Sequence, residues 1–208
     1  MDRSKAAAEI FNKYASDYEG KFMNVSLYAD SFKFFCDSLK QNASVLELAC
    51  GPGNITKYLL NKRPDLKILG TDLATNMIEL AKKNNPSAEF ELLDCREYSK
   101  LNKKFDALLF GFCFPYLNKE EVERAISDSA ALLNEKGVVY ISTMEDNYEK
   151  SGWKKGSKGD EIYMHFYTEK FLSEALVKNG FSVLFTDRKD SFSGSESVTD
   201  LILIAEKN

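Results

Sequence analysis

Two glycines in the run Val45-Leu-Glu-Leu-Ala-Cys-Gly-Pro-Gly-Asn54 mark the segment best suited to holding a ligand. The run begins with the apolar residues of a strand, turns at Gly51 and Gly53, and continues with helical periodicity. Glycine has no Cβ and tolerates a positive φ, so such a turn lets the main chain approach a ligand closely. The N–H groups at the start of the following helix then face the bound group. The run predicts a ligand-binding turn between a strand and a helix.

Two acids follow the next two predicted strands. Asp72 ends the second strand in Gly70-Thr-Asp-Leu-Ala74, and Asp94 ends the third in Leu92-Leu-Asp-Cys-Arg96. A carboxylate at the first position can accept hydrogen bonds from both hydroxyls of a ribose. Open α/β sheets bind ligands at the carboxyl ends of their strands, where these acids and the glycine turn would meet. The three features together predict a nucleoside-type ligand.

The glycine spacing separates two cofactor classes that use this geometry. A dinucleotide-binding turn has the pattern Gly-x-Gly-x-x-Gly, and Thr56 stands where its third glycine belongs. An NAD-dependent oxidoreductase is therefore disfavoured. The run instead resembles the first motif of class I S-adenosylmethionine-dependent methyltransferases, acidic-x-Gly-x-Gly-x-Gly. Glu47, Gly51 and Gly53 are in place, and Ala49 replaces the first glycine.

The resemblance covers nearly the whole chain. Phe11-Asn-Lys-Tyr-Ala-Ser-Asp-Tyr18 is similar to the helix that closes over the cofactor in many small-molecule methyltransferases, and Tyr167–Phe181 is similar to the helix before the sixth strand. It implies an α/β fold of three layers, Rossmann-like, whose seven-stranded and mostly parallel sheet has the order 3-2-1-4-5-7-6 with the last strand antiparallel. It also implies one domain over residues 1–208, with residues 1–40 as a helical cap and 41–208 as the core.

The cofactor implied by the resemblance is S-adenosyl-L-methionine, and the reaction is methyl transfer to a small molecule. In the family, the acid after the third strand and the next N–H address the adenine edge, which here assigns Asp94 and Cys95 to it. The full set of expected cofactor contacts is Tyr18, Glu47, Ala49, Cys50, Gly51, Gly53, Asp72, Leu73, Met77, Asp94, Cys95, Gly111 and Phe112.

The segment Phe110-Gly-Phe-Cys-Phe-Pro-Tyr-Leu117 follows the fourth predicted strand and, by resemblance, faces the transferred methyl group. Aromatic faces there can stabilise a cation and exclude water. Enzymes that methylate nucleobase amines carry (Asp/Asn/Ser)-Pro-Pro-aromatic at this point, and this chain keeps only Pro115 and Tyr116. A nucleobase acceptor is therefore disfavoured. Tyr116 and His165, the only histidine, are the candidate catalytic residues, since a neutral imidazole can take a proton from the acceptor.

Metal-dependent relatives carry an acid after the fourth strand and an Asp-Asn pair after the fifth. Glu145-Asp146-Asn147 supplies the second half of that set, but residues 111–116 contain no carboxylate. Hard divalent cations need several oxygen ligands, so no metal is expected. The cysteines Cys36, Cys50, Cys95 and Cys113 form no Cys-x-x-Cys pair and are predicted to be reduced thiols.

Short β-type runs alternate with helical periodicity from residue 44 onward, which is typical of a mainly parallel sheet. The predicted strands are Val45–Ala49, Lys67–Asp72, Glu89–Leu93, Asp106–Phe110, Val138–Thr143, Ser182–Thr186 and Asp200–Ala205. The predicted helices are Asn54–Asn61, Thr75–Lys83, Lys119–Leu133 and Thr168–Lys178, preceded by cap helices over Ala6–Tyr18 and Val25–Leu39. Gly137 and Gly180 are expected in left-handed conformation after the last two helices. The Gly, Ser and Lys residues of Ser151–Asp160 predict a mobile loop.

Composition narrows the partners and the location. The net charge of −4 and the pI near 5.3 are unfavourable for a surface that binds the phosphates of a nucleic acid, so no nucleic-acid partner is expected. The longest uncharged apolar stretch, Ala107–Leu117, is shorter than the roughly 20 residues that cross a bilayer. No membrane partner and a cytoplasmic location are therefore expected. Two alternatives stay open, a cofactor-binding protein without catalysis and a methyltransferase acting on a protein or nucleic acid, and the oligomeric state stays undetermined.

Overall fold

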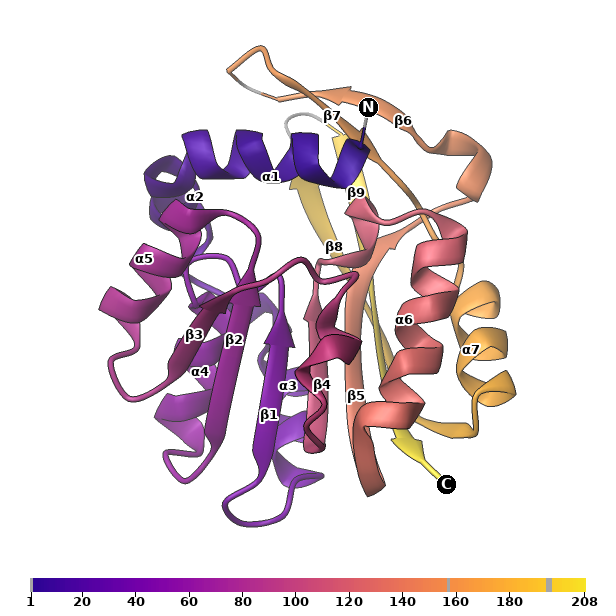
Figure 1. Ribbon diagram of the computed structural model, residues 1–208. Coiled ribbons are helices and arrows are strands. Elements are labelled where there is room, and N and C mark those ends of the chain that lie inside the picture. The colour runs from indigo at the N-terminus through magenta and orange to yellow at the C-terminus, as the bar shows by residue number, and fades with distance from the viewer. Residues whose placement is uncertain (1, 157, 194–195) are drawn as a thin grey trace.

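A central sheet of seven strands has the order β3-β2-β1-β4-β5-β9-β8 in the computed structural model, which describes residues 2–156, 158–193 and 196–208 (Figure 1). β1 pairs in parallel with β2 and β4, β3 pairs in parallel with β2, and β5 pairs in parallel with β4. β9 runs antiparallel to both β5 and β8. β6 and β7 form a separate pair, so β8 and β9 are the sixth and seventh strands of the main sheet. The predicted strand order and the antiparallel last strand are therefore confirmed. The strands are β1 (Ser44–Leu48), β2 (Lys67–Asp72), β3 (Glu89–Leu92), β4 (Phe105–Gly111), β5 (Leu133–Glu145), β8 (Phe181–Ser193) and β9 (Glu196–Lys207).

The central strands are apolar on both faces because helices cover both faces. Ala107 and Leu109 of β4 belong to one apolar cluster with α3 (Ala29–Asp37) and α4 (Asn54–Lys62). Leu108 and Phe110 belong to a second cluster on the other face, with α6 (Lys119–Leu132) and α7 (Glu169–Lys178). α5 (Thr75–Asn84) packs on β2 and β3. The alternation of side chains along one strand therefore supplies both halves of the core.

The predicted cap helix over Ala6–Tyr18 is two helices. α1 (Arg3–Lys13) begins earlier because the Asp2 side chain accepts a hydrogen bond from the Lys5 N–H. The helix breaks at Tyr14 (φ −112°, ψ 25°), and α2 (Ala15–Phe22) follows. The other predicted cap helix is shorter than expected, because the turn η1 (Ser26–Tyr28) precedes α3. In Figure 1, α1 lies across the carboxyl ends of the parallel strands.

Part of the expected mobile loop over Ser151–Asp160 is a strand, so the loop is shorter than predicted, while its mobility stays a prediction; Ser157 lies outside the described residues. β6 (Gly152–Lys155) pairs antiparallel with β7 (Glu161–Met164). Across the pair, Trp153 meets Tyr163 edge to face, with 5.6 Å between ring centroids. This aromatic pair across the two strands stabilises the hairpin despite its lysines.

One of the two glycine predictions is confirmed. Gly180 follows α7 with a φ of +81°. Gly137 does not end a helix, because β5 begins at Leu133 directly after α6, and the left-handed residue there is Lys136 with a φ of 59°. Within the described ranges, no helix is long and apolar enough to span a membrane.

Candidate functional site

The glycine turn after β1 is held by the acid that ends β2. Ala49 and Gly51 both have a φ of 54°, the left-handed conformation that the motif requires. One carboxylate oxygen of Asp72 accepts a hydrogen bond from the Gly51 N–H (2.9 Å), and the other accepts from the Ala74 N–H (2.8 Å). Burial raises the pKa of Asp72, and these N–H groups oppose that shift. The turn and the tip of β2 therefore form one rigid unit.

Three of the expected cofactor contacts lie behind this turn. Glu47 is 1% exposed and accepts a hydrogen bond from the Thr56 hydroxyl; burial raises its pKa to about 7. A Cβ on Gly53 would lie 2.3 Å from the Asn85 amide nitrogen, so this glycine lets α4 pack against α5. Cys50 is buried, and its thiol points to the Gly51 carbonyl oxygen at 3.6 Å. These residues shape the turn and do not line the cavity in front of it.

A cavity of about 100 Å³ lies between the turn, the strand tips and the cap. The expected contacts that line it are Tyr18, Ala49, Gly51, Asp72, Leu73, Met77, Asp94, Cys95, Gly111 and Phe112, together with the candidate catalytic residue Tyr116. Residues not expected there also line it, namely Ser4, Ala7, Ala8, Phe11, Leu93, Cys113 and Leu117. The structure thus brings the glycine turn and both acids to one cavity.

The roof of the cavity is the face of α1 that carries small residues. Ser4, Ala7, Ala8 and Phe11 recur at spacings of three and four, so they share one side of the helix. That spacing is a sequence signal that would have identified them. The Phe11 ring meets Tyr116 edge to face, with 5.1 Å between centroids, and the small side chains let the helix lie close to the strand tips.

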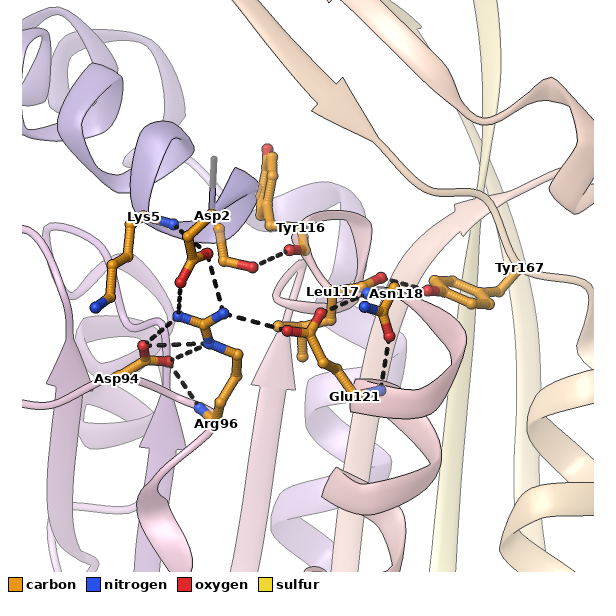
Figure 2. A network of polar contacts seen from close by, with 10 residues as sticks. Asp2, Lys5, Asp94, Arg96, Tyr116, Leu117, Asn118, Glu121 and Tyr167 are labelled. Atoms are coloured by element: carbon orange, nitrogen blue, oxygen red, sulfur yellow. Dashed lines mark hydrogen bonds and ion pairs between the residues drawn. The ribbon is translucent and has the colours of Figure 1, made fainter.

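Asp94 is bound by Arg96 in a network that reaches the cap (Figure 2). The Arg96 guanidinium donates to both carboxylate oxygens of Asp94, at 3.0 and 2.6 Å. It also donates to Asp2, just before α1, at 2.8 Å and to Glu121 of α6 at 3.2 Å. Burial raises the pKa of Asp94, but hydrogen bonds and charge from Arg96 outweigh it and lower the pKa. The network joins the cavity floor to the amino-terminal end of the cap.

The two candidate catalytic residues lie in different places. Tyr116 lines the cavity, and burial raises the pKa of its phenol. His165 is 4% exposed and does not line the cavity; its Nδ1 lies 3.1 Å from the Tyr148 hydroxyl, and its ring stacks on Tyr148. Burial and the charge of Arg3 lower the pKa of His165. The two segments are neighbours, because the His165 N–H donates to the Pro115 carbonyl oxygen at 2.8 Å, but only Tyr116 lines the cavity.

Known proteins share both the sequence pattern and the fold. Residues 45–137 match a family model described as a methyltransferase domain. The chain is 30% identical over 137 residues to a putative methyltransferase, 235L, of Invertebrate iridescent virus 6, covering 60% of this chain and 50% of that protein. It is 26% identical over 207 residues to an uncharacterized methyltransferase of Alkaliphilus oremlandii, covering 94% and 86%. The chain spans half or less of the length of the first curated relatives that it matches.

Solved structures show the same arrangement. Magnesium protoporphyrin IX methyltransferase from Synechocystis PCC 6803, with bound SAM, superposes with a TM-score of 0.74 at 16% identity, covering 100% of this chain and 98% of that one. At such identity the likeness concerns the fold alone. The matched domain, the methyltransferases of similar sequence and the shared fold support a class I S-adenosylmethionine-dependent methyltransferase.

The cavity suits S-adenosyl-L-methionine in chemistry. An adenosyl amino acid presents ribose hydroxyls, an adenine edge and a sulfonium cation. Asp72 and Asp94 offer carboxylates, while Leu73, Met77 and Phe112 offer apolar walls. The carboxylates and the apolar walls therefore fit this cofactor.

Proposed function

We propose that the chain transfers a methyl group from S-adenosyl-L-methionine to a small-molecule acceptor enclosed beneath α1 and α2. The observation that carries this proposal is the aromatic cover of the cavity. Phe11 contacts both Tyr116 and Tyr18, with ring centroids 5.1 and 5.7 Å apart. Burial, with the charge of Asp72, raises the pKa of Tyr18 to about 12. These half-buried rings shield the cavity from water and leave little room for a macromolecular acceptor.

The cofactor would be held by the strand tips. Asp72 would accept the ribose hydroxyls, and the turn at Ala49 and Gly51 would lie against the amino-acid portion. Asp94 and the N–H of Cys95 would address the adenine edge. Glu47, Cys50 and Gly53 would act indirectly, by keeping the turn in shape. When bound, the cofactor supplies an electrophilic methyl group and a neutral leaving thioether.

Alignment of the acceptor is the main contribution expected from the protein. Holding two reactants in line can be worth about 7–11 kcal/mol. A general base contributes a factor of about 10² to 10⁴, or roughly 3–5 kcal/mol. The aromatic side chains of Phe11, Phe112 and Tyr116 would therefore act chiefly by orienting the acceptor and excluding water. This ordering explains why the cofactor side of the site is easier to assign than a catalytic residue.

Binding and turnover test the proposal separately. Calorimetry with S-adenosylhomocysteine should show one site per chain, and incubation with S-adenosylmethionine and a broad panel of small acceptors should release S-adenosylhomocysteine. Binding without turnover on any small acceptor, protein or nucleic acid would favour the catalytically silent alternative. Turnover on proteins alone would replace the small-molecule acceptor. Binding of NAD in place of S-adenosylhomocysteine would contradict the family cofactor.

The cavity favours Tyr116 over His165 as the residue that acts on the acceptor. With an acceptor from the panel, Tyr116→Phe should lower kcat by about 10² to 10⁴ if the hydroxyl moves a proton, and less than tenfold if the ring only orients. His165→Gln should leave kcat within about threefold, since its ring lies outside the cavity. A larger loss in the His165 variant than in the Tyr116 variant would reverse this assignment.

A further inference from the structure

Phe112, in the wall of the cavity, has a backbone conformation that is unusual for a large residue. It follows β4 directly and has a φ of 53°, in the left-handed region. A bulky residue rarely adopts this region, because its Cβ crowds a neighbouring carbonyl oxygen. Phe112 lines the cavity in this strained conformation. Strain of this kind persists only where surrounding contacts hold it, so those contacts shape the cavity as well.

Ser142 of β5 constrains the main chain of Phe112. The Phe112 N–H donates to the Ser142 carbonyl oxygen at 3.0 Å, and the Ser142 hydroxyl oxygen is a second acceptor for it at 3.1 Å. Ser142 is buried, and it pairs with Gly111 in the ladder between β4 and β5. The hydroxyl therefore adds an acceptor at the point where the chain leaves β4.

Tyr28 of the turn η1 packs against the ring of Phe112. The two ring centroids lie 5.4 Å apart, with an angle of 58° between the ring planes. The Tyr28 hydroxyl donates to the Asp200 carboxylate of β9 at 2.7 Å, and Asp200 is 2% exposed. Asp200 pairs with Met144 of β5 inside the main sheet. Although Tyr28 belongs to the cap segment, its hydroxyl is therefore tied to the sheet.

The attachment of Tyr28 differs from that of α1. Asp2, which precedes α1, pairs with Arg96 through a side chain that is 37% exposed. Tyr28 donates instead to a buried carboxylate, and hydrogen bonds to ionised acceptors are stronger than those between neutral groups. Burial and the hydrogen bond to Asp200 raise the pKa of Tyr28, so the phenol keeps the proton that it donates. We therefore expect Tyr28 to stay with the sheet when α1 moves.

We propose that Tyr28 is a positioning residue whose ring, fixed through Asp200, keeps the Phe112 side chain in the wall of the cavity while Ser142 holds the Phe112 main chain. This inference rests on the proposed function, which assigns Phe112 a place beside the cofactor and the acceptor. Tyr28 itself does not line the cavity, so it acts through Phe112. Loss of the Tyr28 hydroxyl should release Phe112 and change the wall against which the cofactor would lie.

Calorimetry with S-adenosylhomocysteine tests the effect of Tyr28 on the site. Tyr28→Phe keeps the ring and removes only the hydroxyl, so binding should weaken about 2- to 10-fold, the effect of one hydrogen bond. Tyr58→Phe is the matched control and should bind as wild type does, because Tyr58 packs on the same Phe32 ring as Tyr28. Wild-type affinity in Tyr28→Phe would overturn the proposal.

A double-mutant cycle shows whether the effect of Tyr28 passes through Phe112. In a Phe112→Leu background, Tyr28→Phe should change the affinity for S-adenosylhomocysteine by less than about twofold, because the ring that Tyr28 positions is gone. A tyrosine that only stabilised the fold would have the same effect on affinity in both backgrounds. That additive result would contradict a positioning role.

Hydrogen exchange of the free protein, followed by NMR, tests the positioning without any ligand. The Phe112 amide should exchange about 2- to 10-fold faster in Tyr28→Phe than in wild type. The amide of Leu108, in the middle of β4, reports opening of the strand itself and should be accelerated less. Equal acceleration of both amides would mean that Tyr28 acts on the whole fold, and the proposal would be wrong.

Ser142→Ala decides the matter if Tyr28→Phe does not fold. It removes the hydroxyl acceptor of the Phe112 N–H and leaves the carbonyl acceptor. Exchange of the Phe112 amide should quicken, and binding of S-adenosylhomocysteine should weaken; if neither changes, Phe112 does not have to be held. If the wild-type protein does not bind this probe at all, the proposed function fails, while hydrogen exchange still shows whether Tyr28 holds Phe112.

Discussion

The strand tips and the cap enclose the same cavity but are held by different kinds of contact. At the tips, main-chain N–H groups of Gly51 and Ala74 bind Asp72, and the Cys50 N–H binds the Thr71 carbonyl oxygen. At the cap, side chains make the contacts: the Ser4 hydroxyl donates to the Tyr116 carbonyl oxygen at 2.7 Å, and Asp2 pairs with Arg96.

Because of this difference, we expect the strand tips to form a rigid floor of the cavity and the cap to form a roof that opens more easily. Main-chain hydrogen bonds at the tips belong to the sheet and its turns, so they open only with the fold. At the outer side of the cap, the exposed Lys13 and the half-buried Tyr14 bind Asp160, which precedes β7. An exposed ion pair such as that of Lys13 is worth about 0–1 kcal/mol. We therefore expect the cap to open more readily than the floor.

The largest expected effect concerns Glu47, buried beneath the floor. Its folded pKa of about 7 lies above its ordinary value of 4.5, so folding favours its neutral form. Below pH 4.5 the folded and unfolded chains both carry it neutral; as the pH rises toward 7, the unfolded chain ionises first and stability falls. Glu47→Gln should therefore raise the free energy of unfolding by up to roughly 3 kcal/mol at pH 8 and by almost nothing at pH 4.

Urea unfolding of both proteins across this pH range measures the effect. The exposed Glu123→Gln on α6 is the matched control and should show no such pH dependence. A variant at Glu47 that is less stable than wild type at pH 8 would mean that the floor requires a buried negative charge.

A smaller effect is expected from Asp72, which belongs to the floor itself. Asp72→Ala removes the acceptor of the Gly51 and Ala74 N–H groups and the proposed acceptor of the ribose hydroxyls. The affinity for S-adenosylhomocysteine should fall by about 1–3 kcal/mol, or roughly 5- to 150-fold, by calorimetry. Asp37→Ala removes an exposed acid on α3 and should leave the affinity unchanged. Unchanged affinity in the Asp72 variant would contradict the assignment of the floor.

The smallest expected effect tests the roof. Asp2→Asn keeps a side-chain acceptor for the Lys5 N–H, since Asn caps helices as well as Asp, but removes the charge that pairs with Arg96. Dissociation of S-adenosylhomocysteine, followed by stopped flow, should quicken about two- to fivefold. The difference should shrink at high salt, because salt screens exposed charges. A slower release, or one independent of salt, would show that Arg96 does not hold the cap closed.

Local chemistry explains which parts of the fold were predictable. The strand pattern and the left-handed Gly180 follow from neighbouring residues, and the structure has both, whereas the strand order and the antiparallel last strand were implied by the family resemblance. The hairpin at Gly152–Met164 was not predictable as such, because its lysines and glycines are typical of a loop and its aromatic pair, Trp153 with Tyr163, forms across two strands. Tyr14, where the cap helix breaks, donates a hydrogen bond to Asp160, which is 146 residues away.

The sequence alone determined the floor of the site, because a glycine turn and the acid that ends the next strand lie within a few residues of the strands that carry them. Only the tertiary structure decided which of these residues reach the cavity, since Glu47 and Gly53 share the motif but serve packing. It also decided the roof and the Arg96 network. Those contacts join segments distant in the chain, and no local preference specifies them.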